Sequence, residues 1–407
     1  MDLYALTDEV LSRCDVLGGI SEEPGQLTRT FPRPPMRDVH AHLRTWMSAA
    51  GLDVRVDAVG NMIGRRPGRT DDARVFVVGS HVDTVPNAGK YDGVLGVLLG
   101  IAAAQALADR QFERTLDVTA FSEEEGVRFR TPYLGSLAVC GRLGPDLLAR
   151  TDADGVSVAN AIHAFGLDPA DIPSAAYLRG KVAGYLEPHI EQGPMLELFN
   201  LPLRVVTAIV GQSRYWLRFI GKAGHAGAQP MAMRCDALAG AAEFVGIVEA
   251  AGEKTDGLRS TVGCLTVAPG AVNVVPGEVR LSLDVRHADD AVRRWHADDL
   301  LHSAAEIADR RRLRLESEQA MDEPAVPMDS GMSERLAATF GPTLSRLVSG
   351  AGHDAAVMAT ICPSAMLFIR SPGGISHHPD ESVRREDVRA ALGVMVRFFG
   401  DELDRED

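Results

Sequence analysis

The chain has 407 residues, of which 45% are hydrophobic and 24% charged, a balance typical of globular proteins and a length that predicts two domains. Its formal net charge of −14 argues against nucleic acid or an anionic membrane as a partner. Five scattered cysteines without a CxxC spacing, and an N-terminus without the basic and apolar regions of a signal peptide, favour a reducing cytoplasm as the location.

The first 180 residues alternate between helical and strand patterns. Residues 38–50 have helical periodicity, and the short apolar run at 74–79 predicts a buried strand. An apolar helix at 93–110 and a second strand at 115–121 follow. A strand, a helix and a strand at this spacing indicate a parallel sheet. Residues 136–178 have a less regular helical pattern.

The pattern changes near residue 206. Residues 214–220 and 278–286 alternate apolar with polar side chains, as half-exposed antiparallel strands do. Helical stretches at 235–251 and 289–310 accompany them. Two strands and two helices of this kind predict a small α+β domain.

A strand at 365–369 and a helix at 385–400 return to the earlier pattern. We therefore expect an α/β domain with a mainly parallel sheet, built from residues 1–206 and 319–407. The smaller α+β domain, residues 207–318, interrupts it.

The first chemical cluster follows the first predicted buried strand. His81 and Asp83 lie in the run SHVDTV, and Asp92 lies at the start of the long apolar helix. Ligands prefer the carboxyl ends of strands in α/β sheets. An imidazole and a carboxylate suit zinc, manganese, cobalt or nickel, and Asp83 could accept the second ring N–H of His81. The alternative is a surface loop with ordinary polar residues.

The second cluster is the run SEEEG, just past the next predicted strand, with Glu123, Glu124 and Glu125 in succession. Three adjacent carboxylates repel one another, and a dication would offset that repulsion. Adjacent side chains point in different directions, so one can bind metal while its neighbour contacts a water molecule. A solvated acidic loop is the alternative.

Two more clusters contain histidines. His189 lies in EPHIEQGP, and His377 lies in GISHHP. Together the four clusters supply three histidines and two carboxylates, which is enough for two metal ions that share one carboxylate. Two such ions can generate hydroxide near neutral pH and stabilise a tetrahedral intermediate.

These motifs carry a family resemblance. HVDTV with a downstream YDG, then SEEEG and HIEQGP, resembles the M20 metallopeptidase clan. GHAG, NVVPGEVRLSLDVRH, SGAGHD and GGISHHPDE extend the resemblance over residues 23–397. The ordered set is similar to one branch, the allantoate amidohydrolases, N-carbamoyl-L-amino-acid hydrolases and β-ureidopropionases. The resemblance implies a di-metal catalytic domain interrupted by a lid and dimerisation domain.

The resemblance also implies a ligand set for two divalent metal ions per subunit, which could be manganese, zinc, cobalt or nickel. His81 and His189 would hold one ion, and Glu125 and His377 the other. Asp92 would bridge the two ions.

The remaining roles come from the same resemblance. Glu124 would be the general base, and His225 would cross from the partner subunit of a homodimer to stabilise the oxyanion. The substrate would be a small ureido or carbamoyl acid. The expected substrate-binding residues are Gln192, Asn273, Arg286 and His353, the last beside Asp354 in the wall of the site.

The chain departs from many relatives at Ala228 and Gln229, where a GHAGTTP pattern is common, and at Arg370 and Pro372. None of these is an expected metal ligand. Residues 321–328 resemble the allantoate subgroup, which makes allantoate the first substrate hypothesis and N-carbamoyl-L-amino acids or N-carbamoyl-β-alanine the alternative. The other functional hypotheses are a dipeptidase, an aminopeptidase or a non-catalytic binding protein with the same fold.

Overall fold

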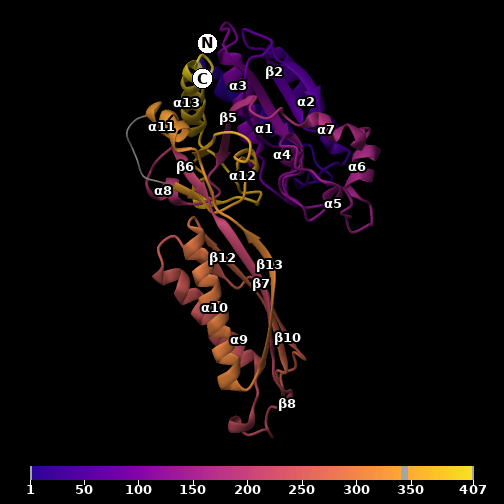
Figure 1. The fold of residues 1–407 in the computed structure, drawn as a ribbon, viewed down its shortest axis with the longest axis vertical. Helices are drawn as coiled ribbons and strands as arrows, with labels where there is room; N and C mark the ends of the chain where they lie inside the picture. The colour runs from indigo at the N-terminus through magenta and orange to yellow at the C-terminus, as the bar shows by residue number, and fades with distance from the viewer. Residues whose placement is uncertain (1, 341–346, 406–407) are drawn as a thin grey trace. The chain divides into compact units, whose positions relative to one another are not determined.

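The computed structural model describes residues 2–340 and 347–405, which form two compact units (Figure 1). The first unit combines the chain up to Thr207 with the chain from Met328 onward. The second unit is the segment Ala208–Pro327. The expected end of the insert at residue 318 is nine residues short of this boundary, because the strand that contains it continues to Glu323 before the chain leaves the unit.

A mixed sheet forms the centre of the first unit, with strand order β1-β2-β4-β3-β5-β16-β6. The four central strands are parallel, while β1, β2 and β6 are antiparallel to their neighbours, so the expected α/β class with a mainly parallel sheet is confirmed. The strands are β1 (Asp53–Val56), β2 (Met62–Arg66), β3 (Val75–His81), β4 (Thr115–Phe121), β5 (Val182–Ile190), β6 (Leu203–Ile209) and β16 (Ser364–Ile369). A short strand, β15 (Leu347–Ser349), pairs with β6.

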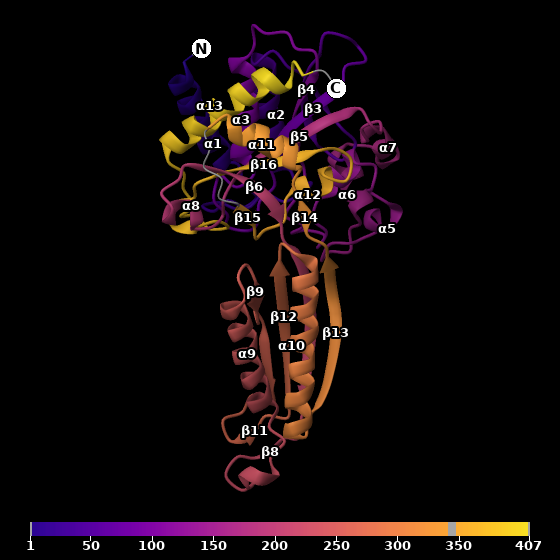
Figure 2. The same cartoon turned by 60° about the vertical axis from the view of Figure 1, so that its left-hand side comes forward.

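The central strands are buried along their whole length. Every residue of β3 and β4 is buried, as expected for parallel strands covered on both faces. The apolar helix α3 (Val94–Ala106) packs on β3, β4 and β5, and α1 (Leu3–Gly18) and α13 (Arg385–Glu402) pack against it. Figure 2 shows these helices beside the sheet. The buried side chains of these helices and strands share one large apolar core.

Eight further helices, most of them short, complete the described part of the first unit. Residues 136–178, expected to be irregularly helical, contain four of them separated by turns. The helices are α2 (Pro35–Ala49), α4 (Leu134–Val139), α5 (Pro145–Leu148), α6 (Val158–Phe165), α7 (Ile172–Ala175), α8 (Met195–Leu198), α11 (Ser330–Ala338) and α12 (Asp354–Met358), with 3-10 turns η1 (Pro169–Asp171) and η3 (Pro372–Gly374).

The second unit is an antiparallel sheet with two helices on one face. The strand order is β10-β12-β7-β13, and β9 also pairs with β12. The bounds are β7 (Gly211–Ile220), β9 (Arg259–Thr261), β10 (Leu265–Ala268), β12 (Glu278–His287) and β13 (Arg314–Glu323). Helices α9 (Ala237–Lys254) and α10 (Asp290–Arg311) pack on the alternating apolar residues of β7 and β12. The two expected strands and two expected helices are all present, but the sheet has three further strands.

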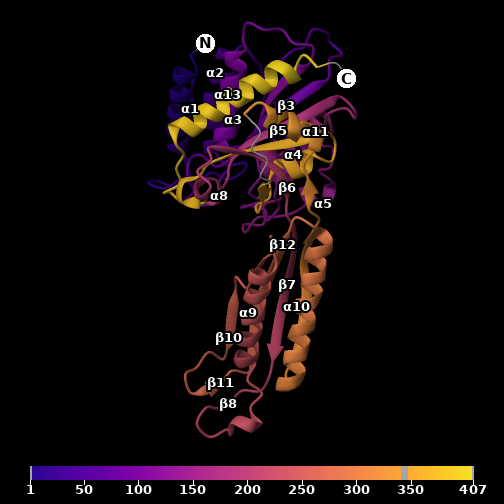
Figure 3. The ribbon, with the colours of Figure 1, turned by 90° about the vertical axis from the view of Figure 1, so that its left-hand side faces the viewer.

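A two-stranded ribbon of β8 (Gly224–His225) and β11 (Val274–Val275) lies at one end of the second unit, next to the 3-10 turn η2 (Met231–Met233) (Figure 3). The chain leaves the unit through the two-residue strand β14 (Val326–Pro327). Within the described residues, no helix combines the length and the apolar character needed to cross a bilayer.

Candidate metal and catalytic site

The predicted ligands converge at the carboxyl ends of the four parallel strands. His81 is the last residue of β3, and His189 is the penultimate residue of β5. Glu124 and Glu125 follow β4, and His377 follows β16. Because neighbouring parallel strands end at the same edge of the sheet, residues almost 300 positions apart in the sequence meet there.

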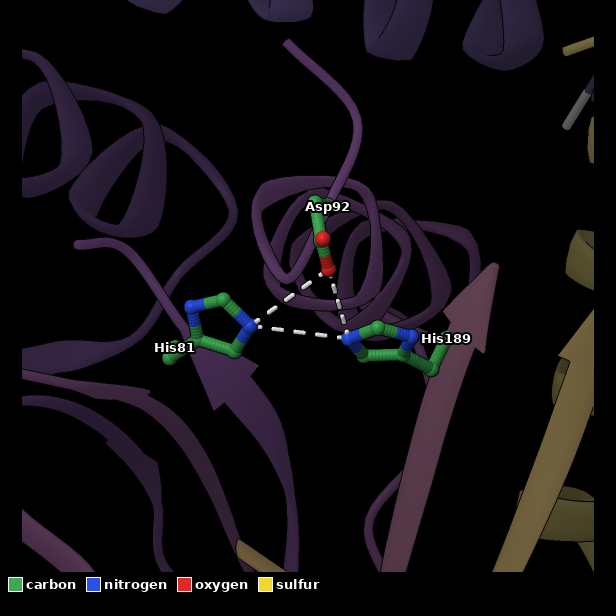
Figure 4. Close-up of side chains that lie close together, drawn as sticks. All are labelled: His81, Asp92 and His189. Atoms are coloured by element: carbon green, nitrogen blue, oxygen red, sulfur yellow. Dashed lines mark hydrogen bonds and ion pairs between the residues drawn. The ribbon is translucent and has the colours of Figure 1, made fainter. Parts of the chain in front are cut away.

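The first group is His81, Asp92 and His189 (Figure 4). The Nε2 atoms of the two histidines are 3.5 Å apart. Asp92 Oδ1 lies 3.0 Å from His189 Nε2 and 3.6 Å from His81 Nε2. Gly93, with φ 65°, lets the backbone pass the His81 ring, because a Cβ there would overlap the imidazole.

A second group shares Asp92 and adds Glu125 and His377. His377 Nε2 lies 3.2 Å from Asp92 Oδ2 and 3.5 Å from Glu125 Oε1. Gln192 donates from Nε2 to Asp92 Oδ2 at 2.9 Å, which places this predicted substrate-binding residue at the same carboxylate. Asp92 is therefore common to two sets of closely spaced ligand atoms.

The chemistry of these residues fits divalent cations. Asp92 Oδ1 is buried and accepts no hydrogen bond within the described part of the chain, although it faces two imidazole nitrogens. A buried carboxylate oxygen without a hydrogen bond is costly unless a cation or another partner stabilises it. Imidazole nitrogen and carboxylate oxygen together suit zinc, manganese, cobalt or nickel.

Burial determines the charge of the two glutamates. It raises the pKa of the Glu124 carboxyl well above its usual range, with nearby His81 opposing the rise, and it raises the pKa of Glu125 to about 7. Burial acts the same way on Asp92, but His189 and the other two histidines outweigh it and hold that pKa well below its usual range. A carboxyl with a raised pKa suits proton transfer near neutral pH.

Asp83 contacts both the His81 ring and the backbone of the two glutamates, whereas only the ring contact was expected. His81 Nδ1 lies 3.1 Å from the Asp83 carbonyl oxygen and 3.4 Å from its carboxylate. The carboxylate accepts the backbone N–H groups of Glu124 and Glu125 at 3.0 and 3.1 Å. The loop after β3 therefore orients both the histidine and the glutamate pair.

His353 lies behind His189 in the interior of the first unit. Its ring packs edge-on against the His189 ring, and its Nε2 is 2.8 Å from Ser349 Oγ. Burial lowers the pKa of His353 well below its usual range, so the imidazole is neutral. It also forms a group with Glu187 and His189 whose polar atoms lie close together.

His225 and Asn273 lie together at the end of the second unit. His225 is in β8, whose partner strand β11 begins directly after Asn273, and Ala226 N donates to the Asn273 carbonyl at 2.9 Å. His225 is exposed, and its Nδ1 accepts the backbone N–H groups of Gly227 and Ala228. The ring proton is therefore on Nε2, which can donate to a ligand.

Arg286 lies at the opposite end of β12. Its Nε and Nη2 donate to the two oxygens of Asp284 at 2.8 and 3.2 Å, and Asp284 also accepts from Arg214 Nε at 2.7 Å. Asp284 was missed at the sequence level, although an acid two residues before an arginine on the same face of a strand is a recognisable signal. Ser376, which donates to Asp92 Oδ2 at 2.8 Å, was also missed, although it directly precedes His377.

Comparisons with known proteins agree with this geometry. Residues 77–401 match the sequence profile of peptidase family M20/M25/M40. The allantoate deiminase of Arabidopsis thaliana is 37% identical, covering 98% of this chain and 83% of that protein. The N-carbamoyl-L-amino acid amidohydrolase of Geobacillus stearothermophilus is 39% identical, covering 94% of both chains. A hydantoinase/carbamoylase family amidase of Burkholderia multivorans has a similar structure, with a TM-score of 0.91 and 31% identity over 98% of both chains.

The chain therefore belongs to peptidase family M20/M25/M40, a metal-dependent family. Within that family it groups with the hydantoinase/carbamoylase branch, as the resemblance of the motifs predicted. The two sequence relatives compared above are named for allantoate and for N-carbamoyl-L-amino acids rather than for peptides.

Proposed function

We propose that the protein is a metal-dependent amidohydrolase that cleaves a C–N bond in a small ureido or carbamoyl acid. The observation that supports this most directly is that one buried carboxylate, Asp92, belongs to two ligand groups, with Glu124 beside them. We propose two divalent cations per subunit, one held by His81 and His189 and the other by Glu125 and His377. Such ions supply Lewis acidity and lower the pKa of a water molecule.

The side chains of the protein supply the proton transfers. Glu124 accepts the proton of the attacking water and then delivers it to the leaving nitrogen. The raised pKa of Glu124 and its burial suit both steps, because the protonated acid is stable enough to act as a donor. Asp83 holds the backbone of Glu124 in place by accepting its N–H.

Allantoate is the first substrate we propose, and N-carbamoyl-L-amino acids are the second. Both contain a ureido group and a carboxylate. A bidentate guanidinium is well suited to a carboxylate, which supports Arg286 as its binding residue. Asp284 fixes that guanidinium by two hydrogen bonds. Gln192 and Asn273 are proposed to bind the remainder of the substrate.

We further propose a homodimer in which His225 donates from Nε2 to the oxyanion in the partner's active site. Two features of the second unit support this proposal: His225 is exposed, and its tautomer leaves Nε2–H available. His225 and Arg286 also lie towards opposite ends of the second unit, His225 in the two-stranded ribbon and Arg286 at the far end of β12, so they suit contacts with different active sites.

Steady-state assays would test the proposed reaction. Hydrolysis of a ureido group yields a carbamate, which decomposes to carbon dioxide and an amine or ammonia, so ammonia release from manganese-loaded enzyme would be measured for the ureido substrates. Dipeptide hydrolysis releases amino acids and no ammonia, so new amino groups would be measured for the dipeptides. The substrates would be allantoate, N-carbamoyl-L-amino acids, N-carbamoyl-β-alanine and dipeptides, with the Glu124→Gln protein as a blank. We expect the highest kcat/KM for allantoate. Turnover of dipeptides alone would contradict the proposed reaction class.

A further inference from the structure

Glu381 is a buried carboxylate that belongs to no metal-ligand group among the described residues. It lies four positions after His377, in the loop between η3 and α13, and is only 4% exposed. Such burial requires partners for its oxygens. Those partners are all in the two loops that contain Asp92 and His377.

The first oxygen of Glu381 holds the backbone of the Asp92 loop. Oε1 accepts the N–H of Tyr91 at 2.8 Å and that of Asp92 at 3.1 Å. Gly89 lies against the same side chain so closely that a Cβ on it would overlap Glu381. Charge-assisted hydrogen bonds of this kind are stronger than neutral ones. The Glu381 carboxylate therefore stabilises the conformation of the loop that contains Asp92.

The second oxygen connects that loop to the histidine segment. Oε2 lies 3.0 Å from Ser376 Oγ, and the same hydroxyl lies 2.8 Å from Asp92 Oδ2. Ser376 directly precedes His377 and is 284 residues from Asp92. Glu381 thus contacts both loops that supply ligands to the second group.

We infer that Glu381 is a positioning residue that keeps Asp92 and His377 at the spacing needed to share a divalent cation. The inference rests on the proposed metal-dependent function. Partners of ligand residues typically change metal affinity by about 10- to 100-fold when they are removed. Glu381 suits this role because it holds the two segments without occupying a ligand position.

Two substitutions separate the contributions of Glu381. Glu381→Ala removes every contact and leaves the N–H groups of Tyr91 and Asp92 without an acceptor. Glu381→Gln keeps an amide oxygen for both N–H groups, and its amide N–H can donate to Ser376 Oγ, so it loses mainly the negative charge. The alanine variant should therefore bind metal more weakly than the glutamine variant, and the parent most tightly.

Glu402→Gln is a matched control. Glu402 is also buried in the first unit, at 5% exposure, and its carboxylate pairs with Arg114 and Arg335. Loss of the Glu402 charge should lower the melting temperature of the metal-free protein and leave its manganese affinity unchanged. This control separates a positioning effect from a general loss of stability.

The experiment is isothermal titration of the metal-free proteins with MnCl2, with circular dichroism to verify folding. We expect Glu381→Ala to weaken manganese binding roughly 10- to 100-fold and Glu381→Gln less. Excess MnCl2 should restore part of the lost kcat. Parent-like affinity in folded Glu381→Ala, or equal weakening in Glu402→Gln, would overturn the inference.

Two further outcomes have a defined meaning. If Glu381→Ala does not fold, the Glu381→Gln protein provides the test. Several-fold weaker manganese binding by that protein supports the inference, and unchanged manganese binding by the folded protein overturns it. If the parent itself binds no manganese, the proposed metal-dependent function fails, and the inference fails with it. That result differs from a parent that binds manganese and a variant that binds it equally well.

Discussion

The adjacent residues Glu124 and Glu125 have different surroundings, and the difference supports different roles. Both backbone N–H groups are held by Asp83, so the pair is presented in a fixed orientation. Glu125 lies 3.5 Å from His377 Nε2, within a group that includes Asp92. Glu124 is the more buried of the two and has the more strongly raised pKa. Both also belong to a group with His81, so their roles need a direct test.

Glutamine substitutions at the two positions provide that test. Glu124→Gln should retain manganese binding and lose about 10²–10⁴-fold in kcat, because the proton acceptor is gone. Glu125→Gln should bind manganese more weakly, because a ligand charge is gone. Calorimetry with MnCl2 and steady-state kinetics would measure both effects. Equal loss of metal in the two variants would reject this division of roles.

Arg286 provides a second test at a single residue. Arg286→Lys should lower kcat/KM severely despite the conserved charge, because an ammonium cannot replace the bidentate guanidinium. Asp284→Asn should have a smaller effect of the same kind, because it weakens the contacts that orient Arg286.

Arg280→Lys is the matched control for Arg286→Lys. Arg280 lies six residues earlier in β12 on the same face and stacks on Trp216. The Arg280→Lys protein should keep parent-like kinetics. Equal turnover of a substrate whose carboxylate is amidated would contradict the proposed role of Arg286.

Among the secondary-structure elements, those with an uninterrupted apolar or alternating pattern were predictable. β3, β4, α3 and β12 follow their expected positions within a few residues. β5 was not predicted as a strand, because it contains the buried Glu187 and a proline. Glu187 is tolerated there because its oxygens accept from Ser80 Oγ and Ala355 N, partners that are distant in the sequence. β13 is mostly exposed and lacks alternation, so only its pairing with β7 defines it.

The same distinction applies to the candidate site. The predicted metal ligands lie together because they follow neighbouring parallel strands, which a sequence pattern can reveal. Glu381, which holds the loops of Asp92 and His377, was missed, because hydrogen bonds to backbone N–H groups impose no characteristic spacing on the sequence. Asp284, which orients Arg286, was missed although its position two residues before Arg286 on the same face of β12 could have indicated it.

The departure at Arg370 has a structural explanation. Its guanidinium makes two hydrogen bonds of 2.7 Å with the buried Asp387, at the start of α13. A third hydrogen bond, to Asn200, links it to the chain after α8. Arg370 therefore connects the end of β16 to helix α13, and it is not a member of any ligand group among the described residues.

Helix α2 supports a prediction about pH. Burial lowers the pKa of His40 from 6.5 to about 4, with a backbone hydrogen bond at Gly60 opposing the shift. The folded protein thus keeps His40 neutral, while the unfolded chain protonates it below pH 6.5. The stabilisation from neutral His40 is complete above pH 6.5 and is lost as the pH falls towards 4.

Replacing His40 should reduce this loss. Between pH 7 and pH 5, the free energy of unfolding should fall by about 1–2 kcal/mol less in His40→Gln than in the parent. Urea unfolding of the metal-free proteins at both pH values would measure the difference. Exposed His42, two residues along the same helix, is the matched control, and His42→Gln should behave like the parent. An identical fall in His40→Gln would contradict the prediction.

At the scale of the whole molecule, the second unit separates two proposed substrate-binding positions. Arg286 lies eight positions along β12 from Glu278, which is at the end near His225. At about 3.3 Å per residue, this is a distance of roughly 26 Å. A small ureido acid is much shorter than that distance. The two residues can therefore serve one substrate only if they come from different copies of the chain, as the proposed homodimer requires.

Subunit mixing would test the homodimer. His225→Ala should lose about 10²–10³-fold in rate with its metals intact, because an oxyanion donor is missing. Mixed with the inactive Glu124→Gln protein, it should recover activity as subunits exchange. One active site of the heterodimer then contains both defects and the other contains neither, so about half of the parent activity per heterodimer is expected.

The control for this experiment is a mixture of Glu124→Gln with a Glu124→Gln, His225→Ala double variant. Every active site in that mixture lacks the general base, so it should stay inactive. Size-exclusion chromatography and mass spectrometry of differently tagged chains would verify exchange. Verified exchange without recovery would place His225 outside the partner's active site.

The position of β16 in the sheet affects how the protein is made on the ribosome. β16 is parallel to β5 and antiparallel to β6, and it lies between these two earlier strands. After Ile209 completes β6, the ribosome adds 154 more residues before Ser364 begins β16, which takes roughly 8–30 s at 5–20 residues per second. During that interval the edges of β5 and β6 that later pair with β16 have no partner strand, while the segment of the second unit is completed at Pro327, before β16 begins. The nascent chain can therefore fold the second unit before the sheet of the first unit closes, and His377 is the last of the proposed ligands to emerge.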